Sequence, residues 1–481
     1  MNFRAVIAVL GFILGVIGLL MATAIPVSLM FGENDADAFI ISVGITLLAS
    51  AGMWLVGRKE RHEVKIREGF AVVALGWIFA SLVGCLPFMI SGAIPSFTDA
   101  FFETMSGFTT TGSSILTNIE SLPHGILFWR SITQWIGGMG MILLSVAILP
   151  LLGIGGMQLF AAEASGLTLE KLTPRISQTA RILWMVYAAL TAALVGLLYL
   201  GGISWFDAVC HGFTTLSSGG FSTKNTSIAF FPSPFIQYVI IIFMFLAGTN
   251  FTLHYRFLKG DVKGYFKDNE FLFYFALILT VSIFMVPWIP SSSVGSFEEQ
   301  CRAAIFQTVS IISTTGFVSK DYELWAPAAQ LVLLLMLFNG GSAGSTAGGI
   351  KIVRILLLLK NGYNEIKKLV HPKAIIPIRF NRRGVDTEII SDVQAFFVLY
   401  ISLFAFMTII MTVMGVDIIS AAGAVATTMA NAGPGLGSVG GVDNFAHIPT
   451  AGKWILTFCM LAGRLELFTV LVILAPAYWR K

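Results

Sequence analysis

Long apolar segments run through the whole chain and decide what it can fold into. Of the 481 residues, 56% are hydrophobic and only 12% are charged, and the mean hydropathy is +0.83. A soluble core of this size would lack the polar surface needed to cover it. Ten runs reach the roughly 20 apolar residues that cross a bilayer: 5–30, 38–56, 69–90, 126–154, 182–200, 235–253, 271–289, 331–359, 393–416 and 454–478. The sequence therefore predicts an all-α polytopic membrane protein with no room for a large soluble catalytic domain.

The basic residues predict the orientation of these spans. If alternate loops are inside, counting from the N-terminus, the inside segments hold 23 of the 30 lysines and arginines. The positive-inside rule then places both termini in the cytosol. The same assignment puts 13 of the 26 acidic residues outside, among them Asp99, Asp207 and Glu298. An outer face with this excess of acid concentrates cations near an entrance.

Four outer segments are too short and too polar to span, and they resemble one another. They cover residues 98–114, 206–222, 302–318 and 420–435. When they are aligned on one glycine each, alanine recurs twelve positions earlier and a hydroxyl residue recurs six positions earlier. The aligned residues are Gly112, Gly220, Gly316 and Gly433; Ala100, Ala208, Ala304 and Ala421; and Ser106, Thr214, Ser310 and Thr427. This pattern predicts a repeating unit of span, half-helix, extended loop and span.

We therefore predict an N-terminal two-helix hairpin, followed by four like-oriented membrane-pore-membrane units in a pseudo-fourfold ring. The hairpin covers residues 1–68, and the units cover 69–175, 176–265, 266–385 and 386–481, the third having a broken second helix. The alternative is that the four segments are ordinary loops whose glycines serve turns and helix packing. Agreement at three aligned columns favours the repeat.

Each loop carries a short Ser/Thr/Asn-small-Gly sequence, which suits an ion filter. Glycine tolerates backbone angles that turn carbonyl groups inward, and four such carbonyls can replace the hydration shell of an ion. The half-helices would end at the ring, where their partial negative charge favours a cation. The predicted filter residues are Thr110, Thr111, Gly112, Ser218, Gly219, Gly220, Thr314, Thr315, Gly316, Asn431, Ala432 and Gly433.

Two further features interrupt apolar spans. One is a Gly-rich stretch in the eighth run, which breaks a helix but which could also be a small-residue packing motif. It contains Gly340, Gly341, Ser342, Ala343, Gly344, Ser345, Thr346, Ala347, Gly348 and Gly349. The other is Arg464 in the tenth run, which must face the protein interior or a water-filled cavity because an arginine in lipid is costly. Its alternative is a buried pair with a carboxylate, for which nearby Glu466 lies on a different helix face.

The four loops together resemble those of the TrkH/TrkG potassium-uptake family, within the superfamily of Trk, Ktr and HKT transporters. The resemblance covers the whole chain and rests on the sequences TTTGSS at 109–114, SSGGFST at 217–223, STTGF at 313–317 and NAGPGLG at 431–437. It implies a K⁺ pathway, with K⁺ held at the filter residues and glycine lining each loop. It also implies that the Gly340–Gly349 stretch is an intramembrane gate beneath the filter and that Arg464 lies in the cavity there. The N-terminal hairpin is typical of the TrkH branch.

The resemblance also implies partners and a location. Family members lie in the bacterial cytoplasmic (inner) membrane, form homodimers, and dock a cytosolic ring of TrkA-like nucleotide-binding regulatory subunits. The basic inner segment at 354–383, with its eight lysines and arginines, suits such docking, although it would equally enforce topology or attract anionic lipid. No nucleic-acid partner is expected, and no cofactor besides the transported K⁺.

Catalysis is not predicted. The four cysteines are far apart, the six histidines lack metal-ligand spacing, and no constellation of catalytic residues occurs. Only His211, inside the second pore segment, merits a test as a ligand. The expected function is uptake of K⁺, with two alternatives: a Na⁺-conducting or Na⁺-coupled transporter, or a non-conducting membrane scaffold. Whether transport is channel-like or coupled to protons or sodium is left open by the sequence.

Overall fold

The computed structural model describes residues 2–57, 66–147, 176–290, 295–374 and 376–480. Within them the regular structure is almost entirely helical. The only strands described are β1 (Arg379–Phe380) and β2 (Arg383–Gly384), which pair antiparallel in a small hairpin. The predicted all-α class is thus confirmed. Parts of the predicted inner loops 58–67 and 171–181, and of the predicted run 126–154, lie outside the described residues.

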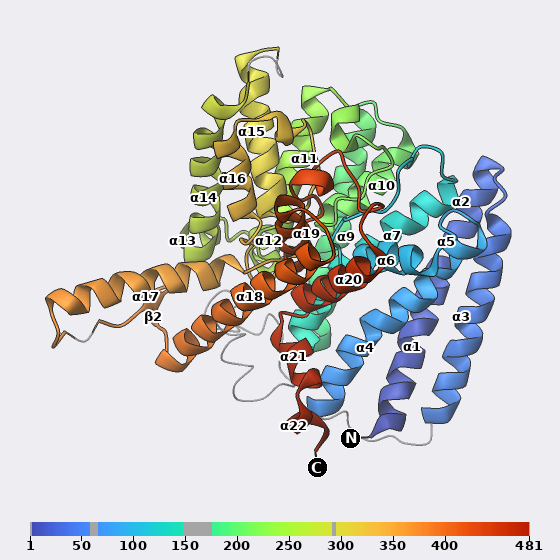
Figure 1. Ribbon diagram of the computed structural model, residues 1–481, viewed down its shortest axis with the longest axis horizontal. Helices are drawn as coiled ribbons and strands as arrows, with labels where there is room; N and C mark the ends of the chain where they lie inside the picture. The colour runs from blue at the N-terminus through green and yellow to red at the C-terminus, as the bar shows by residue number, and fades with distance from the viewer. Residues whose placement is uncertain (1, 58–65, 148–175, 291–294, 375, 481) are drawn as a thin grey trace.

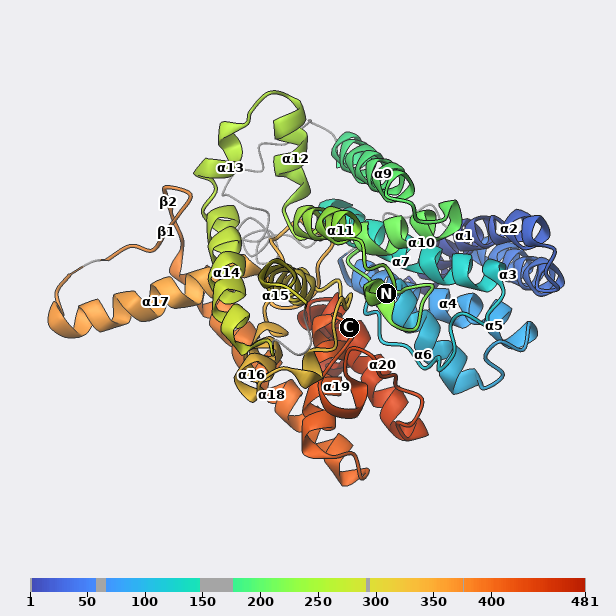
Figure 2. The ribbon, with the colours of Figure 1, turned by 90° about the horizontal axis from the view of Figure 1, so that it is seen from above.

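The first two predicted spans form a hairpin at one edge of the molecule (Figures 1 and 2). It consists of α1 (Phe3–Met21), α2 (Ala24–Phe31) and α3 (Ala36–Gly57). Small residues let α1 and α3 approach closely: Ser50 Oγ donates a hydrogen bond to the carbonyl oxygen of Gly11 at 2.6 Å. Large apolar side chains such as Phe12 and Leu48 are exposed on the outside of the hairpin, as expected where lipid is the solvent.

Six helical stretches of the described chain are long and apolar enough to cross a membrane, and two bent pairs raise the number to eight. Three of the six are single helices: α3, α9 (Ile176–Leu200) and α18 (Thr387–Val413). The other three each combine two elements: α1 and α2; α4 (Ile66–Gly84) and α5 (Leu86–Ile90); and α14 (Asn269–Met285) and the 3₁₀ helix η3 (Val286–Trp288). The bent pairs are α11 (Pro234–Ala247) with α12 (Phe251–Leu258), at 103°, and α20 (Thr450–Arg464) with α21 (Phe468–Leu474), at 118°.

Besides the two bent pairs, two more of the ten predicted runs differ from simple spans. The described part of the run 126–154 forms α7 (His124–Ala147), whose first half carries the buried polar residues Arg130, Ser131, Thr133 and Gln134. The run 331–359 is not one helix. It contains the ten-residue α16 (Pro327–Met336), a non-helical loop, and the start of α17 (Ile352–Val370), which carries lysines along its outer half. A leucine-rich stretch resembles a span in sequence even when glycines divide it.

Four shorter helices occupy the positions predicted for the half-helices. They are α6 (Phe97–Phe108), α10 (Trp205–Leu216), α15 (Phe297–Ile312) and α19 (Ile418–Ala430). Each begins at a capping side chain that accepts backbone amide protons: Ser96, Ser204, Ser296 and Asp417. The remaining short elements are η2 (Ser227–Phe230), α13 (Lys263–Lys267), η5 (Tyr322–Leu324), η6 (Gly437–Val439) and α22 (Pro476–Trp479).

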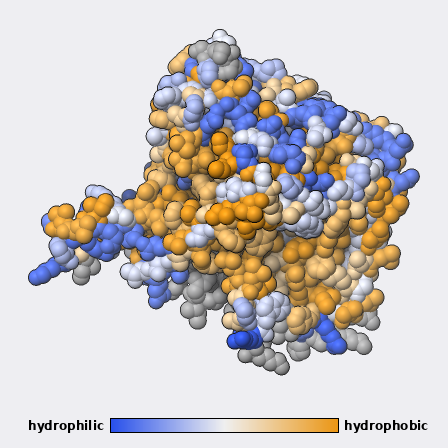
Figure 3. All heavy atoms as spheres, in the orientation of Figure 1, coloured by the Kyte–Doolittle hydropathy of each residue, from blue (hydrophilic) through white to orange (hydrophobic). Residues whose placement is uncertain are grey.

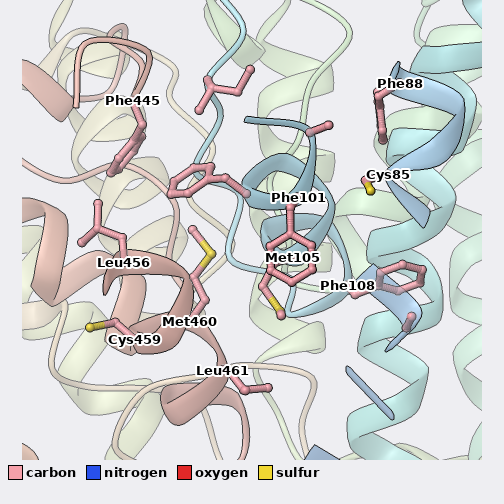
Figure 4. Close-up of a cluster of buried hydrophobic side chains, with 14 of the residues drawn as sticks. Cys85, Phe88, Phe101, Met105, Phe108, Phe445, Leu456, Cys459, Met460 and Leu461 are labelled. Atoms are coloured by element: carbon pink, nitrogen blue, oxygen red, sulfur yellow. The ribbon is translucent and has the colours of Figure 1, made fainter. Parts of the chain in front are cut away.

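Packing joins the four units into a closed ring. Helix α7 packs against α10, α11 packs against α15, α17 packs against α18, and α20 packs against α6. Figure 4 shows the last of these junctions, where Met105 and Phe101 of α6 share one buried cluster with Leu456 and Met460 of α20. The last unit therefore packs on the first, as the pseudo-fourfold arrangement requires. The boundaries of the five predicted segments stay predictions.

Both chain termini lie at the same end of the molecule (Figure 1). The backbone amide of Asn2 donates to Glu68 at 2.8 Å, and the guanidinium of Arg67 donates to the carbonyl oxygen of Arg480 at 3.0 Å. Figure 3 shows apolar residues over most of the visible face, with hydrophilic residues gathered toward the top and at the lower rim. This distribution fits a molecule whose middle is in contact with lipid.

Candidate functional site

The four predicted loops meet in a closed ring. Each glycine lies against the carbonyl group of the residue that precedes the glycine of the next loop. In order, Gly112 contacts Gly219, Gly220 contacts Thr315, Gly316 contacts Ala432, and Gly433 contacts Thr111. A Cβ atom at any of the first three glycines would overlap that carbonyl oxygen, and at Gly433 it would lie 3.0 Å away. Loops that are about a hundred residues apart in sequence thus enclose one centre, and three of the four contacts require a residue without a side chain.

The backbone conformation repeats around this ring. The residue two positions before each glycine has φ between 51° and 56°, and each glycine has φ between 74° and 91°. The first set comprises Thr110, Ser218, Thr314 and Asn431. Threonine and serine rarely adopt the left-handed region, and strain of this kind clusters at functional sites. The surrounding helices hold four strained residues in equivalent positions.

The two other aligned columns have structural roles. The carbonyl groups of Ser106, Thr214, Ser310 and Thr427 accept the amide protons of the residues just before the glycines, at 2.8–3.0 Å. This five-residue reach ends a helix and turns the chain out of it. The four aligned alanines, Ala100, Ala208, Ala304 and Ala421, have no exposed surface. The repeat seen in the sequence is therefore a repeat of helix packing and helix termination.

The ring is suited to holding a cation. Each half-helix ends at it, and a helix C-terminus carries about half a negative charge. The side chains that precede the glycines are buried, whereas Gly112, Gly220 and Gly316 are themselves partly accessible. Irregular backbone inside a membrane protein is tolerated where it is buried in protein or lines a water-filled path. Accessible glycine backbone at the centre of a buried ring matches that description.

Polar side chains of α7 support the ring, and the sequence analysis did not single them out. Gln134 Nε2 donates to the carbonyl oxygen of Gly219 at 2.7 Å, and its Oε1 accepts from the amide of Phe221 at 3.0 Å. Arg130 pairs with Glu103 at 2.6 Å and donates to the carbonyl oxygen of Ser222 at 2.8 Å. The signal available in the sequence was this polar group, placed early in an apolar run.

All ten residues of the predicted gate lie in one non-helical loop between α16 and α17, which we call the gate loop. Residues at its ends are joined, because the amide of Gly340 donates to the carbonyl oxygen of Ile350 at 2.8 Å and Asn339 forms a parallel bridge with Ile350. Small residues also let it pack closely, as at Gly341 against Gly248. The loop therefore breaks the helix, as predicted, and its small residues also pack closely, which was the alternative interpretation.

The gate loop touches three of the four ring loops. The hydroxyl groups of Thr346 and Ser218 are 2.8 Å apart, and the amide of Gly348 donates to Thr314 Oγ1 at 2.7 Å. A Cβ atom at Gly348 would overlap the carbonyl oxygen of Ala430, at the end of the fourth half-helix. The loop thus lies directly against the ends of the half-helices.

Arg464 is fully buried at the end of α20 and bonds to backbone carbonyl groups. It donates to the carbonyl oxygen of Thr346 in the gate loop at 3.0 Å and to that of Gly137 in α7 at 2.9 Å. Glu466 pairs with Arg354 at 2.9 Å and lies in the turn between α20 and α21, not on another face of the same helix. The arginine therefore ties the gate loop to the first unit.

His211 is also buried, but its surroundings are those of a packed side chain. Its Nδ1 lies 2.7 Å from the carbonyl oxygen of Asp207, and its Nε2 lies 2.9 Å from Ser222 Oγ. Among the residues that the structure describes, no three histidine, cysteine, aspartate or glutamate side chains come together as a metal site.

A carboxylate lies close to the end of the fourth ring loop, in a segment that the sequence predicts to be on the outer side. Glu323, in the loop between α15 and α16, has its carboxyl group against Gly440, in the segment that follows the fourth ring loop. The hydroxyl of neighbouring Tyr322 donates to the carbonyl oxygen of Gly435 at 2.6 Å. Partial burial, and then the negative charge of Asp443, raise the pKa of Glu323 from 4.5 to about 7.

Residues 36–481 match the model of a protein family described as TrkH, cation transport protein. The chain belongs to the TrkH family. A chain of this family that is named Trk system potassium uptake protein TrkH, from Salmonella typhimurium, is 41% identical over 486 residues, which cover all of both chains. The Escherichia coli protein named TrkG is 34% identical over all of this chain and 99% of its own.

A TrkH family member of known structure has the same fold. The crystal structure of the potassium transporter TrkH from Vibrio parahaemolyticus matches with a TM-score of 0.91 and 37% identity, covering all of both chains. The TrkH family assignment from sequence is confirmed, and with it the multi-pass membrane architecture. The roles of individual ring and gate-loop residues stay predictions.

Proposed function

We propose that this chain takes up K⁺ across the bacterial cytoplasmic membrane through the four-loop ring. Backbone carbonyl groups of the twelve predicted filter residues bind the ion in place of water. The gate loop and Arg464 control passage below the ring. The protein acts as a transporter and not as an enzyme.

The closed ring of glycine-to-carbonyl contacts is the observation that carries this proposal. A scaffold has no need for left-handed backbone at four equivalent positions, each two residues before a glycine that packs against the next loop. A cation pathway needs them, because only such a backbone turns carbonyl groups toward a common axis.

The choice of K⁺ rests on two supports. All four ring positions carry glycine, whereas family relatives with serine in the first loop tend to favour Na⁺. In addition, the relatives from Salmonella typhimurium and Escherichia coli are both named as potassium uptake proteins. With only about one glycine per loop, we expect fewer ion sites than in a tetrameric potassium channel, so that Rb⁺ passes and Na⁺ leaks.

The gate assignment is supported by contacts on both sides of the loop. Thr346 bonds to Ser218 of the second ring loop and to Arg464 of α20. A loop in this position blocks the path from the ring, and the positive charge of Arg464 raises the barrier to a cation. Passage then requires the loop to move.

We propose that both termini are cytosolic. The positive-inside count supports this, as do the contacts of Asn2 and Arg480 with the start of α4. A reporter enzyme that works only outside the cytosol would be inactive when fused after residue 481. Activity of that fusion would contradict the topology.

We also propose two partners, a second copy of the chain and a cytosolic TrkA-like nucleotide-binding ring. Helix α17 extends away from the body (Figures 1 and 2) and exposes Leu359, Tyr363, Ile366, Leu369 and Val370. A large exposed apolar face of this kind marks an interaction surface. In detergent, a molar mass of one 52.1 kDa chain would contradict the dimer.

Uptake of ⁸⁶Rb⁺ into liposomes that contain only the purified chain tests the function. We expect uptake that K⁺ suppresses best, Na⁺ suppresses weakly, and Li⁺ suppresses least. Stronger suppression by Na⁺ than by K⁺ would support the Na⁺ alternative instead. A second arm adds the cytosolic subunit with its nucleotide, which should raise the flux. Absence of flux in both arms would support the scaffold.

A further inference from the structure

One buried carboxylate holds the gate loop to the helix that follows it. Glu270, in the first turn of α14, is 1% exposed. Its Oε1 atom accepts a hydrogen bond from the amide of Ala343, inside the gate loop, at 2.8 Å. The same atom accepts a second bond from the amide of Val353, in the first turn of α17, at 3.1 Å. A single oxygen atom therefore joins three separate elements.

These two bonds add to contacts that already make the loop and the start of α17 one unit. The amide of Ile352 donates to the carbonyl oxygen of Gly341 at 3.2 Å, and Lys351 Nζ donates to the carbonyl oxygen of Ala347. Within this unit the loop lies against the ring and α17 leads away from it. Glu270 supplies hydrogen bonds that fasten the unit to α14, in addition to the apolar packing of Ile352 against that helix.

Helix α17 is built to transmit a displacement. Its first turn is buried at Ile352, Val353 and Arg354, while its far half is exposed beyond the body of the molecule. Arg354 bonds to Glu466 at the bend between α20 and α21, two residues after the arginine that holds Thr346. Any pull on the far half of α17 acts on these buried contacts and through them on the gate loop.

We propose that Glu270 is a positioning residue that latches the gate loop in its closed place, so that the loop leaves the ring when α17 moves away from α14. This inference rests on the proposed function of the loop as a gate. The latch works through backbone amides. It therefore depends on an acceptor oxygen at the right distance and not on the identity of the loop side chains.

The test compares variants that remove or retain the acceptor. Glu270→Ala removes both bonds, and Glu270→Asp withdraws the carboxylate by one methylene. Each should raise ⁸⁶Rb⁺ flux through the purified chain, without its cytosolic partner, by about threefold to thirtyfold, since two buried amides lose their hydrogen-bond acceptor. Glu270→Gln keeps an acceptor oxygen and should stay close to the original flux. The preference for K⁺ over Na⁺ should be unchanged in all three variants.

Two controls separate a latch from general loosening. Leu10→Ala opens a cavity between α1 and α4, in a cluster that contains no residue of the gate loop, α14 or α17. It should lower thermal stability without raising flux. Arg464→Ala releases the other anchor of the gate loop and should raise flux whether or not Glu270 is a latch.

A second measurement does not depend on transport. In a Cys301→Ser background, Ser342→Cys places a thiol in the gate loop at a position that is 2% exposed. A membrane-impermeant thiol reagent on the side of α17 should label it faster when Glu270 is alanine. Labelling at the same rate would overturn the latch, even for a variant that carries no flux.

The outcomes separate the latch from the gate. Raised flux for Arg464→Ala but not for Glu270→Ala or Glu270→Asp would overturn the latch and leave the gate standing. Unchanged flux in all of these variants would overturn the gate itself, and the latch with it. Equal increases in Glu270→Ala and Leu10→Ala would show that Glu270 acts only through stability.

Discussion

At the scale of single residues, the ring depends on what glycine lacks. A side chain at Gly220 or Gly316 would overlap a carbonyl oxygen of the next loop. The absence of Cβ therefore permits both the positive φ of these glycines and their close contact with that oxygen. The sequence predicted these glycines because their spacing repeats. The sequence did not indicate a role for Gln134, which lies 85 residues from Gly219, whose carbonyl oxygen accepts its hydrogen bond. Such support has no local pattern, since it depends on which helices become neighbours.

Glu323 gives the uptake a predicted dependence on external pH. With a pKa of about 7, its carboxyl group is mostly ionised at pH 8 and mostly neutral at pH 6. Loss of a negative charge beside the entrance lowers the local cation concentration. At low Rb⁺ and low ionic strength, uptake should therefore fall about twofold as external pH drops from 8 to 6. Saturating Rb⁺ should remove the difference.

Two variants check this assignment. Glu323→Gln should be insensitive to pH in this range and should match the original chain at pH 6. Asp443→Asn removes the second cause of the shift and should move the midpoint to lower pH. Because folding raises this pKa, the stability that it contributes is present below about pH 4.5 and is lost as pH rises through 7. A pH profile that Glu323→Gln leaves unaltered would contradict the role.

At the scale of elements, the eighth predicted span shows what pattern reasoning can and cannot supply. The glycines correctly predicted a break in the helix between α16 and α17. The run is divided between α16, which has ten residues, and α17, which leaves the body. That the broken run crosses the membrane stays a prediction. Leucines at 356–359 look alike whether they face lipid, protein or a partner. The contacts of Thr346 with Ser218 and Arg464 join residues more than a hundred positions apart, which no local pattern encodes.

The gate loop should be released by substitution of Arg464. Arg464→Ala removes two charge-assisted hydrogen bonds and a positive charge from below the ring. Rb⁺ flux through the chain alone should rise about tenfold or more. Arg464→Lys keeps the charge but lacks the planar fork that reaches both carbonyl groups, so an intermediate flux is expected. If alanine leaves the flux unchanged, Arg464 has no part in the gate.

At the scale of the whole molecule, four units close on one another so that the last packs on the first. Three aligned columns in the sequence were sufficient to predict this arrangement, because each column has a mechanical role: alanine for packing, a carbonyl group for ending the helix, and glycine for the ring. The N-terminal hairpin lies outside the ring and packs against α4, α5 and α7. These contacts lie within one chain and do not identify its partners or the side of the membrane on which the termini lie, so both stay proposals.

The central claim is that carbonyl groups of the ring select the ion, and Gly316→Ser tests it most directly. Its matched control is Gly202→Ser, because Gly202 has φ +93° but nothing within 4 Å of an added Cβ atom. Both variants bear the cost of left-handed backbone, whereas only Gly316→Ser displaces a ring carbonyl. The measurement is ⁸⁶Rb⁺ uptake into liposomes in competition with K⁺ and Na⁺. We predict that Gly316→Ser lowers the preference for K⁺ by about fivefold, the effect of roughly 1 kcal/mol, and that Gly202→Ser preserves it. Equal preference in the original chain and in both variants would contradict the account.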